Sequence, residues 1–300
     1  MKPASAGYLS VALAAFFWSI SGTSAKFLFR SGITAFELVQ LRTTIAALVL
    51  FLSLYLFDRR VLRVRKKDLA YLVLLGAILA AVQFTYLFTI SLIPVAAAIL
   101  IQYLSPAMIA LHGRIFRKEQ LYPSAVAAIA GAIAGCYFMV GGYSLELFSL
   151  NRTGLISGIL SSAAFAWYTV KSEDGMHRHA PWTILFFALL TAAVIWNLLH
   201  PPLKAFGAVQ DLRSWGLVLY IAMFGTVLPF GLYNYGIRAV RATYASVTAM
   251  LEPVCAAVFA YAVLGEVLEP LQIAGGLLVI VSVVLIQARG TGPARNGSAK

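Results

Sequence analysis

Charged residues are scarce in this chain of 300 amino acids. Asp, Glu, Lys and Arg together make up 11% of the sequence, whereas about 25% is usual in a soluble domain. Hydrophobic residues make up 61%, and the mean hydropathy is +0.86. So few charges could not cover the surface of a soluble fold of this size, and we expect the chain to lie in a membrane.

Cysteine and histidine, which bind metals and take part in catalysis, are also few. The sequence has two cysteines and four histidines. Cys136 and Cys255 fall inside apolar stretches without metal-ligand spacing, and the histidines fall in or beside loops. Neither an HExxH zinc motif nor the lysine motif of a P-loop is present. We therefore expect no metal, no cofactor and no catalytic residue, and a membrane-embedded enzyme is the least favoured function.

Long apolar runs dominate what remains. A bilayer core about 30 Å thick is crossed by roughly 20 helical residues, and backbone groups in lipid must be paired within the segment. The sequence therefore predicts an all-α membrane protein with ten transmembrane helices. These runs are Tyr8–Phe29, Ile33–Phe57, Leu69–Leu92, Val95–Leu111, Pro123–Val140, Thr153–Val170, Trp182–Leu199, Trp215–Gly236, Thr243–Val263 and Pro270–Gln287.

The net charge of +12 is unevenly placed along the chain. With a cytoplasmic N-terminus, most basic residues fall in inner segments, and this bias orients membrane proteins with their positive loops inside. We expect a multi-pass protein of the cytoplasmic (inner) membrane with both termini in the cytoplasm. The run Asp58–Asp68 can contact anionic lipid. It lacks the interleaved aromatic residues that stack on bases, so we expect no nucleic-acid partner.

The chain also repeats itself. A shift of 147 residues places Thr85–Pro106 on Leu232–Pro253 and Glu119 on Glu266, and a shift of 149 places Ala14–Trp18 on Ala163–Trp167. These matches predict two five-helix repeats, at residues 1–148 and 149–288, followed by a disordered cytoplasmic tail at 289–300. Because five is odd, the second repeat enters the membrane from the opposite side. Such inverted repeats are typical of secondary transporters, whose substrate sites lie between the halves.

Together these features resemble the EamA-type members of the drug/metabolite transporter superfamily, over essentially the whole chain. The resemblance implies a carrier of the cytoplasmic membrane, often an exporter of amino acids or related metabolites. It does not extend to proton exchange as in the small four-helix relatives, because the first span lacks their intramembrane carboxylate. The marks that carry it are Trp18, Trp167, Arg42, Pro106, Pro253, the pair Gly265 and Glu266, and the pair Gly275 and Gly276.

Aromatic and amide side chains inside the spans are candidates for a substrate cavity. Trp18 and Trp167 lie in mid-span at matching repeat positions, which the usual preference of Trp for membrane interfaces does not explain. Aromatic walls with a few amides suit small amphipathic organic solutes, although packing between helices is an alternative for each residue. The candidates are Trp18, Gln83, Tyr86, Gln102, Tyr103, Trp167, Tyr233 and Asn234.

Three charged residues in the spans are candidates for coupling or substrate binding. Glu252 lies near mid-membrane, where a carboxylate is rare, and it is either a proton carrier or a structural hydrogen-bonding group beside Pro253. Arg42 lies deep in the second span, where it either binds a substrate carboxylate or, as the favoured alternative, ties neighbouring helices. Glu37 is expected at the outer interface, solvated.

Prolines inside spans are candidate hinges, because a proline removes a helical hydrogen bond. They are Pro106, Pro229 and Pro253. No ATPase domain accompanies the spans, so transport must be secondary. We therefore expect a secondary transporter whose partners are a small-molecule substrate and the bilayer, with an exporter of amino acids or related amphipathic metabolites favoured. The alternative is a translocase of lipids or lipid-linked sugars on the same scaffold.

Overall fold

The computed structural model describes residues 3–120, 122–143, 150–259, 261 and 268–290, and within these ranges all regular elements are helical. The first half contains α1 (Pro3–Arg30), α2 (Ala35–Phe57), the turn η1 (Arg59–Leu62), α3 (Lys66–Leu92), α4 (Val95–Gln102), α5 (Ser105–Phe116) and α6 (Pro123–Met139). The second half contains α7 (Arg152–Met176), α8 (Pro181–Leu199), α9 (Pro202–Ala208), α10 (Leu212–Ala222), the π-turn η3 (Met223–Val227), α11 (Leu228–Val240), α12 (Ala242–Ala249), α13 (Glu252–Phe259) and α14 (Pro270–Gly290).

The predicted fold class is confirmed. Nine stretches of the described helices are long and apolar enough to cross a membrane, and α6 is a shorter apolar tenth. The chain is therefore a multi-pass membrane protein.

The sixth predicted run ends too early, because α7 continues past Val170 to Met176. Its last turns carry charged side chains that hydropathy counts against a helix, but those charges are paired in the structure. The tail from residue 291 on and the pair Gly265 and Glu266 lie outside the described residues.

Within the described residues, three of the spans are interrupted, each beside a proline. The fourth is divided into α4 and α5 just before Pro106, and the ninth into α12 and α13 just before Pro253. In the eighth, the π-turn between α10 and α11 precedes Pro229. Proline cannot donate to the preceding turn and its ring presses on the carbonyl there, so a helix restarts more easily than it continues. The three candidate hinges therefore all lie in the first turn of a restarted helix.

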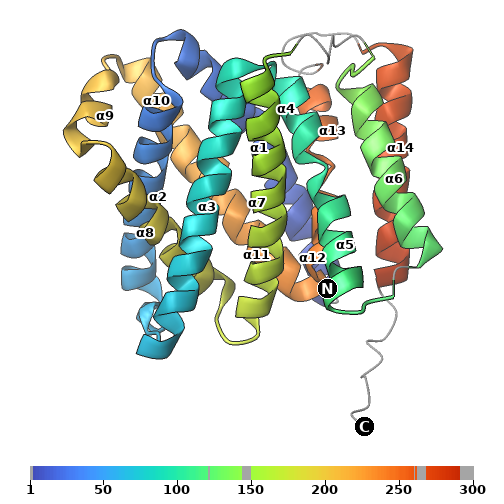
Figure 1. The fold of residues 1–300 in the computed structure, drawn as a ribbon, viewed down its shortest axis with the longest axis horizontal. Helices are drawn as coiled ribbons and strands as arrows, with labels where there is room; N and C mark the ends of the chain where they lie inside the picture. The colour runs from blue at the N-terminus through green and yellow to red at the C-terminus, as the bar shows by residue number, and fades with distance from the viewer. Residues whose placement is uncertain (1–2, 121, 144–149, 260, 262–267, 291–300) are drawn as a thin grey trace.

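The helices form one bundle in which segments from the two halves alternate (Figure 1). α1 packs along α11, and α7 packs along α3. Likewise α1 contacts α12 and α13, while α7 contacts α4 and α5. The first helix of each half thus packs against the third and the interrupted fourth span of the other half. α2 with α8, and α6 with α14, complete the bundle as neighbouring pairs.

The two ends of the bundle differ in charge. One end, called the basic end below, carries Arg59–Arg65 and the segment Arg117–Glu119. α1 begins there and α14 ends there (Figure 1). The opposite end carries the turn Ile93–Pro94 between α3 and α4, together with α9. This naming fixes positions along the bundle without assigning either end to a side of the membrane.

Candidate functional site

A central cavity lies among the interrupted spans. Seven of the side chains expected to bind substrate or ions are on its wall, together with small and aliphatic residues. It is lined by Trp18, Ser21, Gly22, Arg42, Val82, Gln83, Tyr86, Ile99, Gln102, Tyr103, Ser105, Phe165, Gly225, Phe230, Ser246, Ala249 and Glu252.

Aromatic rings form one side of the cavity. Trp18 meets Phe230 and Phe165 edge to face, with ring centroids 5.2 Å and 6.2 Å apart. Tyr233 packs behind them against Trp18 at 5.4 Å, and its hydroxyl is 3.2 Å from that of Thr169. Edge-to-face rings favour one another beyond their buried area. This side is therefore a rigid apolar surface suited to the nonpolar part of a ligand.

A buried positive charge lies on another side. The guanidinium of Arg42 donates from Nε to Thr226 Oγ1 at 3.0 Å and from Nη2 to the Gly225 carbonyl at 3.2 Å. Both acceptors belong to the π-turn, and the helical donor position for the Gly225 carbonyl is Pro229, which has no N–H. Among the described residues, no carboxylate forms an ion pair with Arg42. The cavity thus presents a cation held only by neutral groups.

A carboxyl group faces the same cavity where the ninth span is interrupted. The Tyr103 hydroxyl lies 2.9 Å from Glu252 Oε2 and 3.2 Å from the Ala249 carbonyl. Pro253 has no N–H, so that carbonyl lacks its helical partner. One hydroxyl proton makes only one linear hydrogen bond. Both contacts are satisfied together when Glu252 is protonated and donates to Tyr103, which then donates to Ala249.

The amide of Gln83 is an unused polar group on the cavity wall. The side chain is 2% exposed, and neither Nε2 nor Oε1 has a hydrogen-bond partner among the described residues. An unmet buried amide costs roughly 1–3 kcal/mol per group, so a ligand or water that reached it would be favoured. Gln102, in contrast, is fixed to α7: its Oε1 accepts from Ser161 and its carbonyl from Ser162.

Four of the sequence candidates lie elsewhere. Trp167 does not line the cavity as the sequence had suggested. Its side chain is 50% exposed on the outside of α7, and Phe165 takes the place opposite Trp18. Two helical residues correspond to about 200° of rotation, so these two side chains cannot share a face. Tyr233 lies behind the wall, and Asn234 is buried against the Tyr168 hydroxyl at 3.1 Å. Glu37 closes a capping box with Thr34 at the start of α2.

The sequence analysis missed the small and aliphatic lining residues, although the repeat held a signal for several of them. At a shift of 147, five lining positions pair with another lining position. They are Trp18 with Phe165, Gln83 with Phe230, Ile99 with Ser246, Gln102 with Ala249, and Ser105 with Glu252. Applying that shift to the first span, in place of 149, would have selected Phe165 rather than Trp167.

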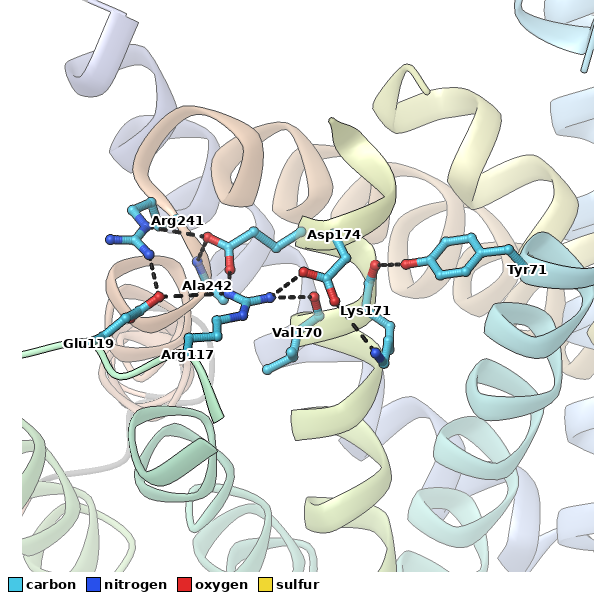
Figure 2. Close-up of polar contacts among 9 residues, drawn as sticks. Tyr71, Arg117, Glu119, Val170, Lys171, Asp174, Arg241 and Ala242 are labelled. Carbon is cyan, nitrogen blue, oxygen red and sulfur yellow. Dashed lines mark hydrogen bonds and ion pairs between the residues drawn. The ribbon is translucent and has the colours of Figure 1, made fainter. Parts of the chain in front are cut away.

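A second hollow lies at the basic end, surrounded by an ionic cluster (Figure 2). Arg117 bonds to Glu173 and, at 2.5 Å, to Asp174, while Arg241 bonds to Glu119 and lies 3.7 Å from Glu173. Burial opposes the charge of Arg117, but the hydrogen bond and charge of Glu173, with Asp174 and Glu119, raise its pKa above the ordinary arginine value. Arg117 therefore stays charged at physiological pH.

Comparison with known proteins gives one family. The model of the "EamA-like transporter family" matches residues 5–141 and again 152–288. Similar proteins include the "Uncharacterized inner membrane transporter YicL" of Salmonella typhimurium, with 27% identity over 93% of this chain and 94% of the relative. The "Pseudopaline exporter CntI" of Pseudomonas aeruginosa is 25% identical over 93% of this chain and 95% of its own. The "Threonine/homoserine exporter RhtA" of Escherichia coli is 26% identical over 71% and 69%.

A solved structure also resembles the fold. For this structure, a "Crystal structure of protein", the TM-score is 0.75 and the sequence identity is 20%. The likeness covers 95% of this chain and 98% of the other. At this identity it supports the fold alone.

Proposed function

The chain belongs to the EamA-like transporter family, and we propose that it is a secondary transporter that exports amino acids or related small zwitterions by alternating access. The family is one of transporters, and the relatives named above are membrane transporters or exporters of small molecules. Two of those relatives are exporters by name, one for threonine and homoserine and one for pseudopaline.

The observation that carries this proposal is that a guanidinium group and a carboxyl group line the same cavity. Arg42 and Glu252 both line the cavity, and neither is paired with the other. A substrate carboxylate would bind the guanidinium of Arg42, and a substrate ammonium group would bind Glu252. The Trp18 side of the cavity then receives the apolar part of the molecule. A zwitterion supplies both charges without adding net charge to a poorly solvated site.

Glu252 gives this proposal a route to coupling. The hydrogen bonds of Tyr103 are complete when the carboxyl is protonated, whereas binding of an ammonium group requires the carboxylate. A proton and the substrate therefore compete for one group. In such an exchange, protonation releases the substrate on one side and substrate binding displaces the proton on the other.

Inverted repeats at 1–148 and 149–288 are part of the proposal. The paired lining positions at a shift of 147 support them, as does the reciprocal packing of α1 on α11 and of α7 on α3. The two family matches, at 5–141 and 152–288, fall one on each half. Rocking of one half against the other would open the central cavity to each end in turn.

We further propose that the basic end faces the cytoplasm, because positive loops are retained there. In a variant without Cys136 and Cys255, a cysteine at Lys204 should react with an impermeant thiol reagent added to intact cells. A cysteine at Arg63 should react only after permeabilisation. Labelling of the Arg63 position from outside intact cells would reverse the orientation.

Transport itself is tested in proteoliposomes. We expect labelled threonine or homoserine to exchange across the membrane faster than in protein-free vesicles, and unlabelled amino acids to compete. A fluorescent-lipid flip assay on the same vesicles is the control. Lipid flipping without amino-acid exchange would support the translocase alternative and contradict the proposal.

A further inference from the structure

We propose that Arg117, Glu119, Glu173 and Arg241 form the gate that closes the transport path at the basic end. This inference rests on the alternating access proposed above. The gate residues come from both halves: Arg117 and Glu119 precede residue 148, and Glu173 and Arg241 follow it. Figure 2 shows their contacts as a row from Arg241 and Glu119 through Arg117 to Asp174 and Lys171.

Two helix faces connect the gate with the cavity. On α7, Phe165 lines the cavity, Thr169 follows one turn later and Glu173 one turn after that. Residues four apart lie on one face of a helix. On α11, Phe230 lines the cavity, and Tyr233 and Ile237 lead toward Arg241 along a similar face.

The space between these faces is sealed in two layers. The Tyr233 and Thr169 hydroxyls meet at 3.2 Å, and Tyr233 and Ile237 are at most 1% exposed. Beyond them, the ionic contacts join the two halves: Arg117 to Glu173 and Asp174, and Arg241 to Glu119. A substrate moving from the basic end to the cavity must pass both layers, so these cross-half contacts have to break.

The gate is also attached to the cavity through α12. Glu173 Oε1 accepts from the Ala242 N–H at 3.1 Å and so caps the start of this short helix. Directly before it, Arg241 has φ = 75°, a conformation uncommon for a side-chain-bearing residue. Ser246 and Ala249 of α12, and Glu252 just beyond it, line the cavity. Movement of Glu173 is thus transmitted through α12 toward the coupling carboxyl at the start of α13.

The opposite end has no counterpart of this gate among the described residues. By the shift of 147, Lys26 takes the position of Glu173, and its Nζ donates to the carbonyls of Ile90 at 2.7 Å and Ile93 at 3.2 Å. Pro94 takes the position of Arg241, and Leu264 that of Arg117. Across the described part of the chain, every ion pair between the halves lies at the basic end, including the contact of His179 with Asp68. The ionic gate is therefore specific to one side.

The gate is tested by a reporter cysteine behind it. Ile237→Cys, without Cys136 and Cys255, is placed between Tyr233 and the gate and is labelled in nanodiscs, where both membrane faces are open to reagent. We expect Arg117→Gln to speed the labelling about tenfold or more. Arg238→Gln is the matched control: Arg238 lines the same hollow without an ion pair among the described residues, and its loss should leave the rate unchanged.

A second experiment cross-links the gate in its closed state. In Glu119→Cys with Arg241→Cys, a short bifunctional methanethiosulfonate should stop transport, and reductant should restore it, whereas each single variant should be insensitive. Equal labelling of Ile237→Cys in the Arg117→Gln and Arg238→Gln proteins, or full transport after cross-linking, would overturn the gate. The labelling rate of Ile237→Cys is measured without substrate, so it tests the gate even if the proposed amino-acid transport is not found.

Discussion

Arg42→Ala should reduce amino-acid transport by at least about thirtyfold. Truncating one partner of a desolvated charge pair typically costs about 2–5 kcal/mol, and roughly 1.4 kcal/mol corresponds to a factor of ten. The substrate carboxylate would lose its only cationic partner on the described cavity wall. Arg42→Lys keeps the charge but not the planar fork and should retain an intermediate rate. Initial rates of exchange in proteoliposomes measure the effect.

A matched control separates substrate binding from helix packing. Thr226→Val removes the hydroxyl that accepts from Arg42 Nε at 3.0 Å but keeps the charge and nearly the same shape. If Arg42 acts as a substrate group, this variant should lose far less transport than Arg42→Ala. Equal losses in the two variants, with equal losses of folded protein, would instead assign Arg42 to the helix tie that the sequence favoured.

Glu252→Gln should abolish the response of transport to a proton gradient. The amide keeps the size of the carboxyl and can still donate to Tyr103, so the contacts of Tyr103 with Ala249 and with residue 252 are preserved. It can neither release a proton nor bind an ammonium group as an anion. Uptake driven by an imposed pH difference, compared with exchange at equal pH, measures the loss.

Tyr103→Phe is the companion variant. It removes the hydroxyl that joins Ala249 and Glu252 but leaves the titrating group in place. We expect a protein that still responds to the gradient, with a lower rate. Accumulation that remains gradient-dependent in Glu252→Gln would exclude this residue as the proton carrier and leave it a structural one.

The membrane spans follow from the sequence because hydropathy is a local property. Every predicted run overlaps a described helix, and the positions of Pro106, Pro229 and Pro253 indicate the spans that are interrupted. The contact between the π-turn and Arg42 has no such signal. The carbonyl of Gly225 accepts from Arg42, which is 183 residues away in the chain. Contacts over that distance depend on how the helices pack, which a single sequence does not specify.

The site was predicted only in part for the same reason. Gln83, Tyr86 and Tyr103 were selected as polar or aromatic groups in apolar spans, and they line the cavity. Trp167 was selected by matching letters between two spans at a shift of 149, two residues more than the shift of 147 that pairs the lining positions. The ionic cluster was overlooked because Arg117 and Glu119 are loop residues in the sequence. Their partners lie 56 and 122 positions away.

The pairing of Ser105 with Glu252 sets the stoichiometry of the proposed exchange. Among the described lining residues there is one carboxyl, because its repeat counterpart is a hydroxyl that does not titrate. If coupling proceeds through Glu252, each cycle moves one proton against one neutral zwitterion and so transfers one net charge. The membrane potential then contributes about 2.3 kcal/mol per 100 mV, enough for roughly a fiftyfold substrate gradient. A carrier of this kind is driven by voltage even when the pH is equal on both sides.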